Sequence, residues 1–169
     1  MRRFAKDRRG VAAVEFALLG LPFLALLLAT FDLAFYFFRD HVLQASAAAG
    51  ARAVRTGQVG RAADQAAVFR NAVCNAAAPA FACNEMVFDV RRWDSFAAVA
   101  TLPAVSYDQN GVPSNAVFQP GAPSEVQTIR ILAQHRFVTP FLASALSGSH
   151  GQVFLNATVI IRGEPWPVN

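Results

Sequence analysis

An unbroken apolar stretch near the N-terminus constrains this chain more than any other feature of its sequence. The 23 residues from Phe16 to Phe38 contain a single charged residue, Asp32. As an α-helix with a rise of about 1.5 Å per residue, this stretch would be roughly 34 Å long, and a hydrocarbon core is about 30 Å thick. The sequence therefore predicts one transmembrane span over residues 16–38.

The distribution of charge predicts the orientation of this span. Residues 1–10 carry five basic side chains and one acid, whereas residues 11–169 carry ten of each. Basic residues before a span favour a cytoplasmic N-terminus, so everything after Phe38 is expected on the far side of the membrane. The formal net charge of +4 belongs entirely to the first ten residues. The balanced remainder does not favour nucleic-acid binding, which needs a basic patch.

Three kinds of N-terminus begin with basic residues and continue with apolar ones: a cleaved secretory signal, an uncleaved signal anchor and a prepilin-type leader. A secretory signal has an apolar region of about 7–15 residues that ends at a small-x-small site, and this apolar region is longer. Ala45-Ser46-Ala47 has that form, but it lies beyond Arg39 and Asp40 in an alanine-rich stretch, so we treat the match as coincidental. The other two alternatives stay open at this point.

Glu15 stands at the edge of the predicted span, where a carboxylate is costly to bury without a partner. The positive end of the helix dipole and interfacial water would already accommodate it in the first turn of a helix. A second interpretation involves the chain terminus. If the chain is cut after Gly10, the free amine of Val11 lies one helical turn from Glu15. The carboxylate could then pair with that amine or with the same amine of a neighbouring subunit.

The residues around this position resemble a known pattern. Gly10-Val-Ala-Ala-Val-Glu15-Phe16, preceded by basic residues, resembles the cleavage motif of class IV prepilins of the Flp type. Together with Pro22 and the later Ala48-Ala49-Gly50-Ala51-Arg52, it is similar to the TadE-like family, whose members are minor pseudopilins of the Tad (tight adherence) pilus. Phe16 stands where the major pilins usually carry tyrosine. A looser similarity extends over residues 118–121, 126–142 and 161–164.

This resemblance implies a processing site and a set of partners. A prepilin peptidase would cleave after Gly10, so the processing site comprises Gly10, Val11, Glu15 and Phe16. The mature chain would lie in a bacterial inner membrane, in contact with the lipid bilayer, with its C-terminal domain in the periplasm. Its partners would be other minor pseudopilins, the major Flp pilin and the inner-membrane assembly platform of the pilus.

The sequence after the span continues the helix, so we expect a single helix over residues 11–56 that follows a leader of residues 1–10. Ala45, Ala49 and Ala53 recur every four residues and would let another helix approach closely. Asp32 would either reach the membrane surface or pair with an arginine of a partner helix. Pro22 would introduce either a tolerated kink or a flexible segment.

Residues 57–169 are expected to form one small periplasmic α+β domain. The predicted elements are a helix over 61–78, a short helix over 139–146, and strands over 85–93, 125–137 and 152–162. The expected fold is pilin-like: a long N-terminal transmembrane helix followed by a helix packed on an antiparallel sheet of about three strands. The long connection 96–124 is apolar enough to pack onto the domain, and it would be either a partner-facing surface or a loop without such a role.

Cys74 and Cys83 are the only cysteines, and both follow the span. An exported compartment permits a disulfide between them, and the alternative is a pair of buried free thiols.

No motif announces catalysis. The three histidines, His41, His135 and His150, fall on different predicted elements, and the sequence lacks a nucleophile elbow or a phosphate-binding loop. We therefore expect no enzymatic activity, no metal and no cofactor. The rival functions are an uncleaved, signal-anchored periplasmic scaffold and a periplasmic enzyme or ligand-binding domain on a membrane anchor.

Overall fold

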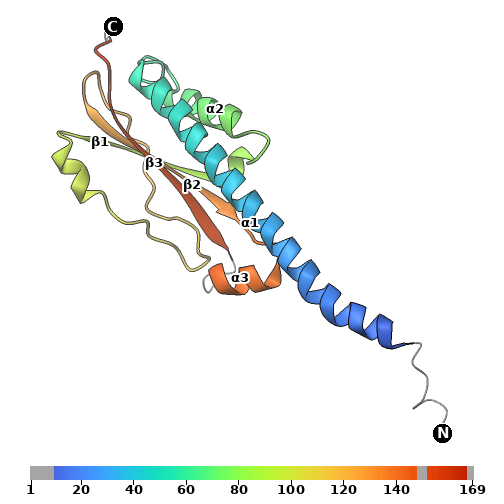
Figure 1. The fold of residues 1–169 in the computed structure, drawn as a ribbon. Helices are drawn as coiled ribbons and strands as arrows, with labels where there is room; N and C mark the ends of the chain where they lie inside the picture. The colour runs from blue at the N-terminus through green and yellow to red at the C-terminus, as the bar shows by residue number, and fades with distance from the viewer. Residues whose placement is uncertain (1–9, 148–151, 167–169) are drawn as a thin grey trace, which may run out of the picture.

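The longest element, helix α1, extends from Val11 to Arg55 and passes through Pro22 without a break (Figure 1). This computed structural model describes residues 10–147 and 152–166. Thr56 is the C-cap residue of α1, and Gly57 follows with a φ of 76°. That left-handed conformation favours glycine and is common just after a helix. The single long helix predicted from the sequence is confirmed.

The domain contains a three-stranded antiparallel sheet in the order β1-β2-β3. The strands are β1 (Met86–Trp93), β2 (Val126–His135) and β3 (Val153–Arg162). The remaining helices are α2 (Gln65–Ala77), α3 (Pro140–Leu146) and the short 3₁₀ turns η2 (Cys83–Glu85) and η3 (Ala97–Thr101). The predicted α+β fold class is therefore confirmed. The predicted turn between α3 and β3 lies mostly outside the described residues.

Helix α2 begins four residues later than the sequence predicts. The side chain of Asp64 accepts a hydrogen bond from the backbone N–H of Ala67 at 2.9 Å and so caps the helix. An aspartate in this position satisfies an amide that the first turn would otherwise leave unpaired. Residues 61–63 therefore precede the helix, although alanines there extend the apolar pattern.

One face of the sheet packs against α2 and the second half of α1 (Figure 1). The buried core takes residues from every layer, including Leu43, Ala47, Val54, Phe69, Val73, Val90, Ile129, Ile131 and Leu155. Helix α2 lies especially close to α1 at Gly50, where an added Cβ atom would lie 2.6 Å from Cγ2 of Val73. Helix α1 is thus part of the domain core.

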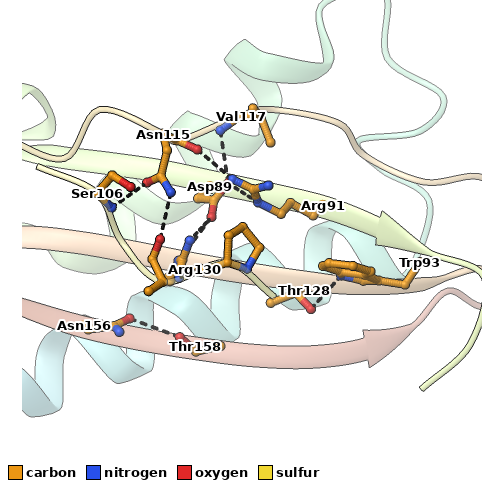
Figure 2. Close-up of polar contacts among 12 residues, drawn as sticks. Asp89, Arg91, Trp93, Ser106, Asn115, Val117, Thr128, Arg130, Asn156 and Thr158 are labelled. Carbon is orange, nitrogen blue, oxygen red and sulfur yellow. Dashed lines mark hydrogen bonds and ion pairs between the residues drawn. The ribbon is translucent and has the colours of Figure 1, made fainter. Parts of the chain in front are cut away.

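The opposite face of the sheet contains a buried ion pair between neighbouring strands. Asp89 of β1 and Arg130 of β2 are register partners, and they are 1% and 5% exposed. Oδ2 of Asp89 accepts hydrogen bonds from Nε of Arg130 at 3.1 Å and from Nη2 at 2.5 Å (Figure 2). Oδ1 of Asp89 also accepts a hydrogen bond from Nε of Arg91 at 2.9 Å. Because an unpaired buried charge is very unfavourable, Arg130 in particular requires Asp89.

The same ion pair holds the long connection 96–124 against the sheet. Oδ1 of Asp89 accepts a hydrogen bond from the backbone N–H of Val117 at 3.0 Å, and Nη1 of Arg130 donates to the carbonyl of Pro103 at 2.9 Å. The chain beside Val117 also forms a short parallel pairing with the outer edge of β1. The connection therefore packs onto the domain as its apolar composition predicts, and a role as a partner-facing surface stays a prediction.

We predict that Asp89→Asn lowers the free energy of unfolding by about 3–5 kcal/mol, because Arg130 would remain buried without a counter-charge. The connection 96–124 should then become sensitive to chymotrypsin. Chemical denaturation and limited proteolysis of the full chain in detergent measure these effects. Asp94→Asn removes an exposed carboxylate just after β1 and should change neither measurement. Equal stability of the two variants would contradict the prediction.

Candidate functional site

The predicted processing site lies at the start of α1 and is exposed. Gly10 is the N-cap residue, and nothing lies within 4 Å of the position of an added Cβ atom. Val11 is 49% exposed and Phe16 is 78% exposed. Glu15 is exposed one helical turn after Val11, and within residues 10–147 and 152–166 it has no hydrogen bond or ion pair. Both residues that flank the Gly10–Val11 bond are accessible; residues 1–9 of the predicted leader fall outside the described residues.

The first half of α1 exposes apolar side chains all around its circumference. Every residue from Val11 to Phe31 is exposed except the half-buried Gly20 and Ala29. The most apolar window of 18 residues in this helix has a mean hydropathy of 2.3, and none of it is buried. Soluble surfaces rarely contain an apolar patch of this size. The length and composition of this half-helix fit a single-pass membrane anchor.

Asp32 marks the point where α1 meets the domain. Its side chain is 7% exposed, and Oδ2 accepts hydrogen bonds from the backbone N–H groups of Val138 at 3.0 Å and Thr139 at 2.8 Å. These two residues lead directly into α3. Sequence analysis proposed either a position at the membrane surface or an arginine of a partner helix for this carboxylate. The structure instead provides two backbone amides of the same chain.

An aromatic cluster follows on the same side of α1. The ring of Tyr36 stacks on Phe137 with a centroid distance of 5.5 Å. His135, at the end of β2, is 1% exposed and packs edge-on against both rings. Nη1 of Arg39 lies 3.5 Å from Nδ1 of His135, whose Nε2 has no hydrogen-bond partner among the described residues. Burial, followed by the charge of Arg39, lowers the pKa of His135, although Asp32 opposes this shift.

Arg39 connects α1 to the segment between α2 and β1. Its guanidinium carbon lies 4.1 Å from the ring centroid of Phe81, and Nη2 lies 3.6 Å from Oε2 of Glu85. Burial lowers the pKa of Arg39 and the charge of Glu85 acts in the opposite direction. An arginine remains protonated under such conditions. Residues 32–39 therefore form a junction that holds the domain to α1 through hydrogen bonds, stacking and charge.

The small-residue stripe does not coincide with the packing face of α1. Ala45 is exposed, Ala49 is half-buried and Ala53 is buried. Helix α2 approaches one residue farther along at Gly50, while the fully buried Ser46 donates a hydrogen bond to the carbonyl of Leu43. The helix that packs here belongs to the same chain. A contact of the exposed Ala45 side with another subunit stays a prediction.

The two cysteines lie where the sequence predicts a bond between them. Cys74 of α2 and Cys83 of η2 form a disulfide with their Cα atoms 5.3 Å apart. The bond ties α2 to the turn that begins β1. Its closed loop is short, so the entropy it removes from the unfolded chain is modest.

The junction is not evident in the sequence. No motif there gives Arg39 or His135 a role or connects Asp32 to residues 138–139. No local pattern could have shown it, because Asp32 and its donors are 106 and 107 residues apart in the sequence. Within the part of the chain that the structure describes, no group of three histidine, cysteine or acidic side chains could hold a metal. The clearest functional features are therefore an accessible N-terminal bond, an apolar helix and the junction below it.

Comparison with protein families supports the resemblance found in the sequence. The family model described as TadE-like protein matches residues 10–52. The matched stretch begins at Gly10 and lies almost entirely in α1, and it points to a protein associated with the Tad pilus. The looser similarities after residue 118 fall outside it. No curated protein and no solved structure matches the chain.

We predict that Asp32→Ala loosens the junction. Each hydrogen bond to a charged group contributes about 1.5–3 kcal/mol, so the free energy of unfolding should fall by at least that amount. Hydrogen exchange in residues 137–146 should accelerate, because the amides of Val138 and Thr139 lose their acceptor. Asp40→Ala removes an acid from the same helix that makes no hydrogen bond or ion pair within the described ranges, and it serves as the control. Unchanged exchange in the Asp32 variant would refute the role of this contact.

The lowered pKa of His135 predicts a pH dependence of stability. The unfolded chain takes up a proton near pH 6.5, whereas the folded chain resists protonation until lower pH. The melting temperature should therefore fall as the pH drops below about 6.5. His135→Phe should flatten this dependence, whereas His41→Gln, at an exposed position, should preserve it. Thermal unfolding between neutral and mildly acidic pH measures the difference, and an identical slope in all three proteins would contradict the prediction.

Proposed function

We propose that this chain is a minor pseudopilin of a Tad/Flp pilus that a prepilin peptidase cleaves after Gly10. The observation that carries the proposal is that two boundaries meet at one exposed peptide bond. The match to the TadE-like family begins at Gly10, helix α1 begins at the next residue, and both residues that flank the bond are exposed. A peptidase that works at the membrane surface needs an accessible bond at this position.

Cleavage would give Glu15 a specific partner. The new amine of Val11 would lie four residues before Glu15, which places both groups on one face of α1. A charge beside a hydrocarbon layer is costly without a partner, so pairing within the chain or with a neighbouring subunit would lower the cost of insertion. Glu15 would thus assist the assembly of helices into a pilus subcomplex in the bacterial inner membrane.

The domain would serve assembly through contacts in the periplasm. Its orientation follows from the basic N-terminus, which favours a cytoplasmic leader. The disulfide between Cys74 and Cys83 suits an oxidising compartment. The partners of this domain would be other minor pseudopilins, the major pilin and the inner-membrane assembly platform.

The intact mass of the protein tests this function directly. The full chain is purified from membranes of cells that also produce a prepilin peptidase, and we expect a mass that lacks residues 1–10. A Gly10→Leu variant should keep the leader, because the prepilin motif that the chain resembles has a glycine directly before the cleaved bond. A full-length mass for the unchanged chain would instead favour the uncleaved, signal-anchored scaffold.

Glu15→Ala separates processing from assembly in the same cells. We expect reduced processing or, where cleavage proceeds, a loss of pili and of co-purified pilus subunits. Asp40→Ala removes an acid from the same helix outside the processing site and should leave both intact. Normal cleavage together with normal piliation in the Glu15 variant would refute the role of this carboxylate.

A further inference from the structure

Helix α3 and the residue pair before it expose an uncharged, apolar surface. Val138 is 87% exposed, Phe141 is 73% exposed and Leu146 is 51% exposed. No charged residue occurs anywhere from Phe137 to Leu146. Large apolar side chains this exposed, without an intervening charge, indicate contact with a partner or a membrane.

The junction places this surface at a defined level along α1. The carboxylate of Asp32 binds the two amides that precede α3, and Phe137 stacks on Tyr36. Figure 1 shows α3 beside the middle of α1, at the end of the domain that faces the exposed apolar half of the helix. Helix α3 therefore lies at the level of Asp32.

The length of the apolar half of α1 places this level at the membrane boundary. The exposed residues from Val11 to Phe31 form a helix of about 31 Å, which equals the thickness of a hydrocarbon core. Asp32 would then lie at the outer boundary. If the span is instead 16–38, Asp32 and α3 lie roughly 9 Å deeper. The first placement puts the apolar surface of α3 at the outer interface of the bilayer, and the second puts it inside the hydrocarbon core.

An apolar groove joins the two surfaces. It lies between α1 and the start of α3, and its walls include Ala25, Leu28, Phe35, Val138 and Pro140. The groove is continuous with the exposed surface of α1 below Asp32, which the membrane would cover. An acyl chain matches this groove in chemistry and direction, because both run along the axis of the span.

We propose that α3 and Val138 form a second membrane contact, in which their apolar side chains enter the outer interface of the bilayer beside α1. Interfacial segments of this kind bury their apolar face about 5–10 Å below the head groups. The contact fixes the rotation of the whole chain about the axis of α1 relative to the membrane, and it keeps the domain against the bilayer before the subunit is assembled. This inference rests on the membrane insertion of α1 in the proposed function.

Tryptophan fluorescence in vesicles of phosphatidylcholine and phosphatidylglycerol tests the contact. Phe141→Trp and Val138→Trp place reporters on the proposed surface of the full-length chain. Phe96→Trp is the matched control, because Phe96 is 58% exposed but lies in the connection held on the other face of the sheet. Leu24→Trp reports on the span itself. Emission of the unsubstituted chain, which contains Trp93 and Trp166, is subtracted.

We expect lipids brominated near the head group to reduce the emission of the Phe141 and Val138 reporters, and lipids brominated in mid-chain to reduce that of the Leu24 reporter. Aqueous iodide should quench only the Phe96 reporter. If the Leu24 reporter is quenched by lipid while the α3 reporters respond to iodide, the second contact is refuted and the span stands. Shielding of the α3 reporters from both quenchers would mean that protein, such as a second copy of the chain, covers the surface, and would also refute it. If bromine fails to quench the Leu24 reporter, the membrane insertion of α1 fails and this inference fails with it.

Discussion

The domain is built around the same continuous helix whose first half is apolar on every side. Leu43, Ala47 and Val54 of α1 lie in the core with α2 and the sheet. Residues 11–31 extend beyond the domain as an exposed helix. Because a helix transmits position rigidly along its axis, the location of the membrane segment fixes the height of the domain above the membrane. The remaining features of the molecule depend on this shared helix.

The junction at residues 32–39 lies between the exposed apolar half of α1 and the half that packs in the domain core. Asp32 and Arg39 bind the domain here, while Phe31 and Phe35, which line the groove beside Asp32, stay exposed. Asp32 is an acid within an apolar segment, and its carboxylate accepts hydrogen bonds from two backbone amides of the domain. Such a contact costs little desolvation beyond what the fold already requires, because both donors also need a partner.

The far face of the sheet follows a different principle. The connection 96–124 on this face carries few charges and little regular structure. Hydrogen bonds from the ion pair of Asp89 and Arg130 hold it against the sheet. A buried ion pair adds little net stability compared with an apolar pair of similar volume. It does specify geometry, because Asp89 and Arg130 must each satisfy further backbone groups. Here those groups are the amide of Val117 and the carbonyl of Pro103.

Periodicity and composition determined a large part of this protein before any tertiary contact was known. The long helix, the three strands and the pairing of Cys74 with Cys83 all follow from local patterns, since helix and strand periods and a two-cysteine count leave few alternatives. The resemblance that begins at Gly10 is equally local, because a processing motif is read along the chain.

Only the tertiary structure decided which residues meet across long separations. Asp32 finds its donors 106 and 107 residues later, and Asp89 pairs with an arginine 41 residues away. No periodic signal encodes such pairs. The packing of α2 at Gly50 and not along Ala45 and Ala49 could not be predicted either, because small residues occur on both faces of this part of α1. The level of α3 relative to the membrane depends on those contacts, so it too is a property of the fold.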